Sequence, residues 1–476
     1  MAPHHGNLGN TSGARHTEVG HGALLPLRTF QDAARVTSAT VPQRWTCSRC
    51  GVHSCEPSCF ANPPSNGRRA RDVRCIACHV DSRGKGIGRL PLITLVPLAM
   101  AFVVAETWSG FLALLLLSAL ALVVLVPLSI VLHELAHALV ATLVGLEVGG
   151  FVLGTGPVIW AGELRGVPAE VRTFPGGGFT SLGCNGTSWP RLRFWLATAA
   201  GPAADVALTI LAVAFWVPFS NAVSAPVAAL CVAITATSVA INLFPFLHRQ
   251  FGDLAATDGL ILLLLPTISR DSLLAGWRIS APLFRARLSL ARGAFATAHA
   301  ASMEGLARAP GHAQLQLYLS ASLIYQNGAQ AALDVLRRIL GEIGSVEPIW
   351  RAVAQSDASV ALMLCKRGTV EEAAAMKEAD ELSRLAFEAF PCLLSQRFAR
   401  AVVLTWTGRA PEALQLLARR PYRGAARSLC GERLVATALA LRSLGNHEDA
   451  ARALAAARDF WPPSAGLYES LAAGQQ

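Results

Sequence analysis

The sequence predicts a mainly α-helical membrane protein in two parts. A polytopic transmembrane helical core with short membrane-associated β-hairpins comes first, and a soluble, solenoid-like α-helical repeat domain follows. Hydrophobic residues make up 53% of the 476 residues and charged residues only 15%, with a mean hydropathy of +0.42. These values are typical of chains that cross a membrane several times. Four long apolar runs and a later series of regularly spaced glycines divide the chain into its two parts.

The residues that precede the apolar region carry most of the positive charge. Residues 1–45 are rich in Gly, His, Ser and Thr without hydrophobic periodicity, which predicts a disordered basic arm. Residues 1–89 hold 12 Lys and Arg against 5 Asp and Glu, in a chain of net charge +10. Beside a membrane span, such an excess more often marks the cytoplasmic face than a nucleic-acid site. We therefore expect no nucleic-acid partner.

Residues 46–80 form a cysteine-rich segment that contains six of the eleven cysteines. Two Cys-x-x-Cys pairs have the spacing of a zinc ribbon, in which four thiolates bind one structural Zn²⁺. Cys55 and Cys59 are alternative ligands, and disulfides are an alternative to the metal that a cytoplasmic placement disfavours. The predicted ligands of this second zinc are Cys47, Cys50, Cys75 and Cys78.

Four apolar runs predict four membrane spans, at about 90–107, 110–145, 194–217 and 223–247. The second run is long for one span, so we expect a single tilted or broken helix with a kink at Pro127. The turns at 107–110 and 218–226 carry no charge, whereas the segments 146–193 and 248–258 carry arginines. By the positive-inside rule, both termini are then cytoplasmic.

The second run ends in the motif His133-Glu134-Leu-Ala-His137. From residue 90 to residue 132 the only ionisable side chain is Glu106, so the motif arrives on a helix suited to a bilayer. Two imidazoles four residues apart lie on one helix face and can bind one Zn²⁺, and the intervening glutamate can deprotonate a metal-bound water. Ionisable groups at membrane depth are costly, which favours a functional role over a chance motif.

Residues 146–186 are rich in glycine, and apolar residues alternate along this segment. This pattern predicts hairpin-like strands that lie against the membrane or dip into it near the motif. Such strands can offer an edge to an extended substrate.

Two further motifs follow the histidine motif in order. Ala200-Gly201-Pro202 lies in the third apolar run, and Asn242-Leu-Phe-Pro245 ends the fourth, followed by Asp258-Gly259. With the HExxH motif, this series resembles the site-2 protease family of intramembrane zinc metallopeptidases. The resemblance covers roughly residues 90–266.

The resemblance implies a role for each polar residue of these motifs. His133, His137 and Asp258 would bind the catalytic Zn²⁺, and Glu134 would act as general base. Asn242 would position the substrate or the developing oxyanion. Each role suits the residue type, since two imidazoles and one carboxylate leave a zinc-bound water acidic, and an amide can donate to a tetrahedral intermediate.

Two features depart from the family pattern. Twelve residues separate Pro245 from Asp258, which leaves Asp253 as an alternative third ligand. Asp205 occupies a position after the Gly-Pro pair where an uncharged amide is expected. Read without the resemblance, Asn242 can be a plain C-cap and Asp258 the N-cap of the apolar segment 259–266.

From about residue 270 the chain changes character, because helical periodicity in Ala, Leu and Arg replaces the apolar runs. Glycines that each follow a helical stretch are spaced by 35 to 40 residues, and an alanine follows each glycine. Prolines fall where second helices would end. The glycines are Gly293, Gly328, Gly368, Gly408 and Gly445; the alanines are Ala298, Ala332, Ala373, Ala413 and Ala450; the prolines are Pro310, Pro391, Pro421 and Pro462. We expect residues 275–465 to form tetratricopeptide-like helix pairs that dock protein partners; a non-repetitive helical domain is the alternative.

Together these features predict an intramembrane zinc metalloendopeptidase whose core spans residues 90–267. It would hydrolyse peptide bonds of single-span membrane proteins near the cytoplasmic face, and the composition favours a bacterial cell membrane. Two alternatives remain open: a membrane metallopeptidase whose third ligand is a glutamate, and a catalytically silent scaffold that binds partners through its helical repeats.

Overall fold

The structure is a computed structural model. It describes residues 45–46, 53–54, 108–184, 186, 188–216, 225–245, 247–250, 253–342, 346–418 and 427–472. The first predicted span, at 90–107, and residues 1–44 of the basic arm lie outside the described residues. So do all four predicted ligands of the cysteine segment, Cys47, Cys50, Cys75 and Cys78. Near them, β1 (Trp45–Thr46) pairs with β2 (His53–Ser54).

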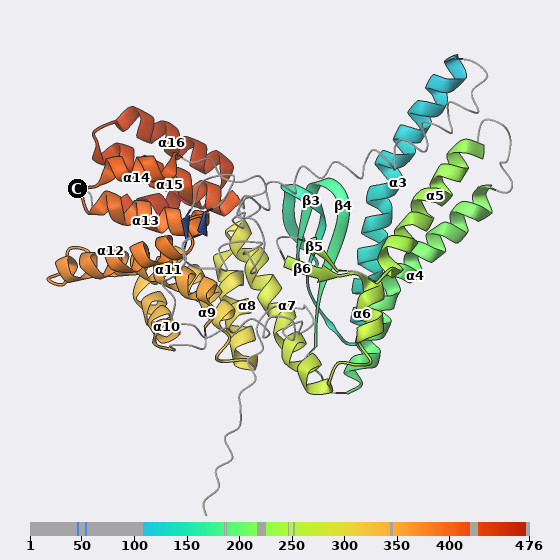
Figure 1. Ribbon diagram of the computed structural model, residues 1–476, viewed down its shortest axis with the longest axis horizontal. Helices are drawn as coiled ribbons and strands as arrows, with labels where there is room; N and C mark the ends of the chain where they lie inside the picture. Colours follow the sequence, from blue (N-terminus) through green and yellow to red (C-terminus); the bar gives the residue numbers. More distant parts are fainter. Residues whose placement is uncertain are drawn as a thin grey trace, which may run out of the picture.

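Three apolar helices lie side by side at one end of the molecule (Figure 1). They are α3 (Trp108–Leu143), α4 (Pro190–Trp216) and α5 (Ala225–Leu243), which confirms three of the predicted helical runs. Two of them, α3 and α4, contain a stretch that is long and apolar enough to cross a membrane, at Val123–Leu143 and Pro190–Ala214. Large apolar side chains face outward from these helices, as expected where lipid replaces water. α3 is one continuous helix that includes Pro127.

A single long hairpin follows α3 and folds back on itself. β3 (Glu147–Leu164) and β4 (Val167–Gly183) are joined by a turn at Arg165 and Gly166. Residues 151–153 of β3 pair with residues 178–180 of β4 on one side and with residues 169–171 on the other. The two strands therefore form a small four-stranded sheet. Glycine allows the reversal in β3, because Gly154 and Gly156 both adopt φ +86°.

This sheet lies between the three apolar helices and the C-terminal helices (Figure 1). On the side of the apolar helices, Ala138 of α3 packs with Phe151 and Ala169. On the other side, α7 (Arg270–Arg292) approaches so closely that a Cβ added at Gly149 would lie 2.6 Å from the Cα of Ala281. The sheet is thus packed on both faces, and its position depends on both neighbours.

A short segment connects α5 to the C-terminal helices. β5 (Leu247–Gln250) pairs with β6 (Asp253–Ala256), and α6 (Asp258–Leu264) follows directly. A Cβ added at Gly259 would overlap the carbonyl oxygen of Leu243. Glycine is therefore required at this position for the start of α6 to lie against the end of α5.

The C-terminal region consists of stacked helices, each packed on its neighbours in the sequence. It begins with α7, five residues earlier than expected from the repeat pattern. The helices after α7 are α8 (Phe295–Arg308), α9 (Ala313–Tyr325), α10 (Ala329–Gly341), α11 (Pro348–Lys366), α12 (Glu372–Ala389), α13 (Leu394–Trp406), α14 (Ala410–Leu417), α15 (Arg427–Ser443), α16 (His447–Phe460) and α17 (Ser464–Ala472).

The glycine pattern marks the turns within the helix pairs. Four of the five glycines adopt positive φ after a helix: Gly293 (78°), Gly368 (67°), Gly408 (77°) and Gly445 (77°). At the remaining junction Asn327 takes the left-handed conformation, with φ 60°, and Gly328 follows it. Four of the five alanines are buried, but Ala373 is exposed, and Ala375 is buried in its place. Helix α12 begins at Glu372, which puts Ala373 on its outer face.

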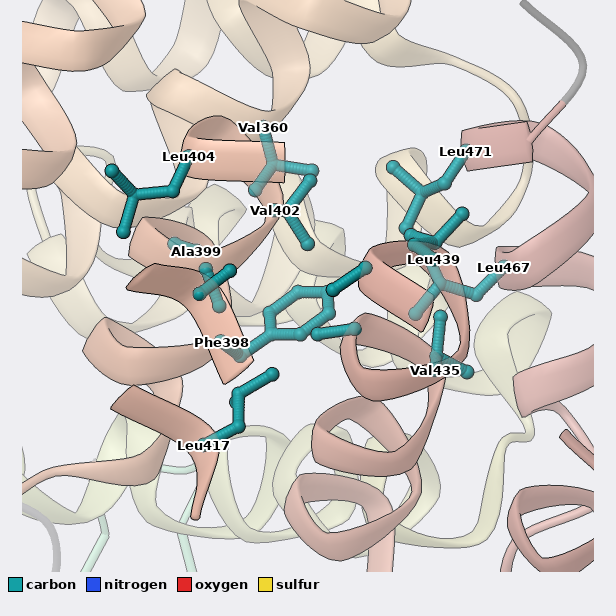
Figure 2. Packing of buried hydrophobic residues seen from close by; sticks show 14 of the residues in the cluster. Val360, Phe398, Ala399, Val402, Leu404, Leu417, Val435, Leu439, Leu467 and Leu471 are labelled. Atoms are coloured by element: carbon teal, nitrogen blue, oxygen red, sulfur yellow. The ribbon is translucent and has the colours of Figure 1, made fainter. Parts of the chain in front are cut away.

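Small and branched side chains fill the core of the C-terminal helices (Figure 2). Phe398 of α13 lies among Leu417, Val435 and Leu439, which come from α14 and α15. The first and last helix pairs also meet, because the Tyr325 ring stacks on Phe295 with centroids 4.4 Å apart and contacts Trp461 edge-on. Figure 2 labels ten of these core residues.

Two carboxyl groups, of Asp357 and Glu432, are half-buried where the helix pairs meet. Burial raises the pKa of Asp357 to about 8, and the nearby Glu432 charge adds to the effect. Burial likewise raises the pKa of Glu432 to about 7, although the Tyr325 hydroxyl donates a hydrogen bond to it. In an unfolded chain these groups titrate near a pKa of about 4. The folded repeat region therefore binds protons more tightly than the unfolded chain.

We predict that the C-terminal helices lose stability as the pH rises from about 5 towards 8. The contribution of each carboxyl is complete below its unfolded pKa and falls by up to about 1.4 kcal/mol per pH unit until its folded pKa is reached. Hydrogen exchange of the α11 and α15 amides, corrected for intrinsic rates, measures this change. Asp357→Asn and Glu432→Gln should flatten it. Equal or greater protection at pH 8 in the unmodified chain would contradict the prediction.

Candidate metal centre

Three side chains from two helices converge on one point. His133 and His137 lie one turn apart on α3, and their Nε2 atoms are 3.0 Å apart. The Oδ2 atom of Asp258, at the start of α6, lies 3.0 Å from Nε2 of His133 and 3.4 Å from Nε2 of His137. Tetrahedral ligands with bonds of about 2.0–2.1 Å are roughly 3.3 Å apart. The three ligand atoms therefore have the separations that a bound Zn²⁺ requires.

Hydrogen bonds on the far sides of the two rings determine which nitrogens face this point. Nδ1 of His137 donates to the carbonyl oxygen of Ala197 at 2.7 Å, and Nδ1 of His133 donates to Oδ2 of Asp205 at 2.8 Å. In a neutral imidazole the other nitrogen then carries a lone pair. Two lone pairs 3.0 Å apart in a buried site repel each other unless a cation lies between them. The donor set therefore fits a metal ion.

Glycine at position 201 makes room for the metal ligands. Gly201 lies within α4, and a Cβ at this position would overlap Nε2 of His137 and lie 2.6 Å from Nε2 of His133. Both rings are held by the hydrogen bonds to Ala197 and Asp205 and cannot easily move aside. The glycine of the Ala-Gly-Pro motif thus lets the α4 backbone pass directly beside the centre.

Asp258 is positioned by the residues on either side of it. Thr257 is the N-cap of α6, since its hydroxyl accepts from the backbone N–H of Leu260. The same hydroxyl donates to the carbonyl oxygen of Phe244 at 2.7 Å, which ties α6 to the end of α5. Asp258 is the first helical residue, so the alternative in which it is the N-cap is wrong. The side chain of Asp253, the alternative ligand, lies outside the described residues.

Glu134 lies beside the three ligands and under strand β4. Its side chain is 5% exposed, and Oε2 accepts a hydrogen bond from the Thr180 hydroxyl at 2.5 Å. A Cβ added at Gly178 would overlap Oε1 of Glu134. Residue 178 must therefore be glycine for β4 to pass over the carboxylate.

Asn242 is near the centre but on the far side of His133. Its Nδ2 donates to Oδ2 of Asp205 at 2.8 Å. The same Nδ2 also lies 3.3 Å from Nδ1 of His133. The structure thus brings Asn242 together with the predicted ligands, on the outer side of the His133 ring and not at the point where the ligand atoms meet.

Three contacts of the site were not foreseen from the sequence. Thr180 and Gly178 belong to a predicted strand, but no pattern pairs them with Glu134. The run of three glycines at 176–178 was a signal that the strand approaches another group closely. The contact of Asp205 with His133 was also not predicted: in the sequence Asp205 is only a departure from the family pattern, although it is the one acidic residue of α4. An acid in an apolar helix indicates a functional role.

We predict that Gly201→Ala prevents metal binding at this centre. The added methyl group would occupy the space beside both Nε2 atoms, so the variant should lose one Zn²⁺ per chain relative to the unmodified protein. Elemental analysis of purified protein measures the loss. Gly276→Ala is the matched control, because an added Cβ there meets nothing within 4 Å. Equal zinc in the two variants would show that residue 201 does not border the metal.

Comparisons with known proteins agree with this site. The sequence matches Peptidase family M50 over residues 120–404, more than half of the chain. The C-terminal region is similar to the crystal structure of a thermophilic TPR protein of Thermus thermophilus, at 17% identity and a TM-score of 0.32, over 40% of this chain and 98% of that one. No curated protein matches the chain. The chain belongs to peptidase family M50, the site-2 protease family of membrane metallopeptidases.

Proposed function

We propose that the protein is an intramembrane zinc metalloendopeptidase that hydrolyses peptide bonds of single-span membrane proteins near the cytoplasmic face. The observation that carries the proposal is the convergence of His133, His137 and Asp258 on one point beside Glu134. An adaptor that had lost its activity would have no need to keep the buried carboxylate beside a complete set of ligands.

Each residue of the centre has a distinct part in the reaction. His133, His137 and Asp258 would hold Zn²⁺, which would supply Lewis-acid activation of the attacking water and of the scissile carbonyl. Glu134 accepts the proton of the attacking water and passes it to the leaving amine. Thr180 restrains the Glu134 carboxylate through its 2.5 Å hydrogen bond and leaves Oε1 to exchange the proton. Burial of the histidines and of Glu134 keeps bulk water away from the reacting atoms.

The sheet supplies a means of presenting an extended substrate. A peptide bond within a transmembrane helix is hydrogen-bonded and hidden, so the substrate must unwind before it is cut. Residues 180–183 of β4 pair with β3 on one side, and no other strand in the described part of the chain pairs with these four residues. A substrate strand that adds to β4 would lie next to Glu134, which Thr180 and Gly178 contact.

The helical repeats are well placed to regulate this sheet. Arg308 of α8 forms an ion pair with Glu147 of β3 at 2.8 Å, and Arg292 of α7 pairs with Glu163 at 2.6 Å. The backbone of α7 contacts the sheet at Gly149. A protein partner bound to the repeats could therefore shift β4 relative to Glu134. We propose that the repeats recruit partners or gate access in this way.

The remaining parts of the proposal follow from the sequence. The enzyme would lie in a bacterial cell membrane as a multi-pass protein with both termini in the cytoplasm. The cysteine-rich segment would bind a second, structural Zn²⁺ through Cys47, Cys50, Cys75 and Cys78.

The two alternative functions predict different properties for variants of the metal centre. A metallopeptidase with a glutamate as third ligand would keep its zinc and activity in Asp258→Ala. The only group of three potential ligands in the described part of the chain uses Asp258, which favours the proposed enzyme. A silent scaffold would bind partners equally well with or without Glu134.

We predict that Glu134→Gln reduces cleavage by a factor of about 10²–10⁴, because the amide cannot accept a proton. The assay uses the full chain reconstituted in liposomes with candidate single-span substrates, and mass spectrometry locates the scissile bond. Zinc content should be unchanged, since Glu134 is not a ligand. Cleavage by Glu134→Gln at the unmodified rate would show that Glu134 is not the general base, and the absence of cleavage by the unmodified chain would favour the scaffold.

We also predict that Gly149→Ala slows cleavage several-fold without loss of zinc. The added methyl group would lie 2.6 Å from the Cα of Ala281 and must push the sheet away from α7. Gly276→Ala serves as the control, because it adds the same methyl group to α7 at a position where the new Cβ meets nothing within 4 Å. Cleavage rate and zinc content are measured on the same preparations. An unchanged rate in Gly149→Ala would mean that the packing of α7 on the sheet does not control the site.

A further inference from the structure

A buried carboxylate lies on the side of His133 that faces away from the metal ligands. Asp205 of α4 is 1% exposed, and its Oδ2 accepts from Nδ1 of His133 at 2.8 Å. The opposite ring nitrogen of His133 is the one that meets His137 and Asp258. Asp205 therefore contacts the centre only through the His133 ring and is not itself a ligand.

Asp205 has few other partners. Nδ2 of Asn242 donates to the same oxygen at 2.8 Å, and Oδ1 is buried without a hydrogen-bond partner among the described residues. No cationic side chain forms an ion pair with Asp205 in the described part of the chain, apart from the His133 ring. An anion buried in an apolar helix needs a nearby positive charge. In this site a metal ion bound to Nε2 of His133 would supply the positive charge, and the imidazole ring would transmit its effect to Asp205.

The charges of the centre are consistent with this arrangement. Zn²⁺ bound by the Asp258 carboxylate would keep one positive charge, and the Asp205 carboxylate faces that charge across the His133 ring. A carboxylate that accepts from the distal nitrogen of a metal-binding histidine selects its tautomer and makes the ring a stronger ligand.

We propose that Asp205 is a positioning residue of the metal centre: oriented by Asn242, it holds His133 in the Nδ1–H tautomer and increases the affinity for Zn²⁺. The inference builds on the proposed function but concerns metal binding, not proteolysis. Asn242 then acts through Asp205, and its amide is not a donor to the oxyanion of the substrate.

The affinity of the full-length protein for Zn²⁺ in detergent, measured by competition with a chelator, tests the proposal. Asp205→Asn keeps the shape of the side chain but removes its charge, and it should raise the Kd by about 10- to 100-fold. The visible spectrum of the Co²⁺-loaded protein should change as well, because the electron donation of His133 changes. Asp380→Asn is the control, a carboxylate that pairs with Arg400 in the repeats. An unchanged Kd in Asp205→Asn overturns the proposal.

A double-mutant cycle tests whether Asn242 acts through Asp205. Asn242→Ala should raise the Kd for Zn²⁺ by a smaller factor, and this effect should disappear in the Asp205→Asn background. Equal effects of Asn242→Ala in both backgrounds would contradict the link. If Asp205→Asn does not fold, an unchanged Kd in Asn242→Ala still overturns the proposal.

Added zinc separates this inference from the proposed function. Cleavage by Asp205→Asn should recover when excess Zn²⁺ saturates the site, whereas Glu134→Gln should stay inactive. If neither variant nor the unmodified protein cleaves any substrate, the proposed protease fails, but the Kd values still decide the role of Asp205.

Discussion

The structure depends most on two buried histidines of an apolar helix, whose Nε2 atoms lie 3.0 Å apart. With Nδ1 of each ring committed to Ala197 or Asp205, both lone pairs point to the same place. A positive charge has to occupy that place, and Asp258 completes the ligands for it. The glycine at 201, the N-cap at Thr257 and the glycine at 259 all serve to bring other helices close enough.

The position of the sheet connects this centre to the rest of the molecule. β4 covers Glu134 from one side, and α7 packs on the opposite face of the same sheet. The first helix of the C-terminal region is therefore also part of the scaffold of the candidate metal centre, and the family match over residues 120–404 includes this helix.

Much of this organisation could be predicted from the sequence. The apolar runs predicted three of the described helices and glycine spacing predicted the helix pairs, because each pattern is local. The HExxH motif indicated the two histidine ligands, whereas Asp258 was implied only by the resemblance to the site-2 protease family. Contacts between distant strands and helices were not predictable in this way. Thr180 reaches Glu134, and Ala281 reaches Gly149, only because the hairpin folds back on itself. Ala373, the alanine that follows Gly368 in the spacing pattern, is exposed because the start of α12 determines which of its residues face inward.

Zinc K-edge X-ray absorption of the full chain, compared between the unmodified protein and Asp258→Ala, tests the central claim most directly. The account predicts nitrogen and oxygen scatterers at about 2.0–2.1 Å, including imidazole, that weaken or vanish in the variant. Sulfur at about 2.3 Å would come from the cysteine segment and should be equal in both samples. Identical spectra, or sulfur alone in both, would contradict a zinc centre built by His133, His137 and Asp258.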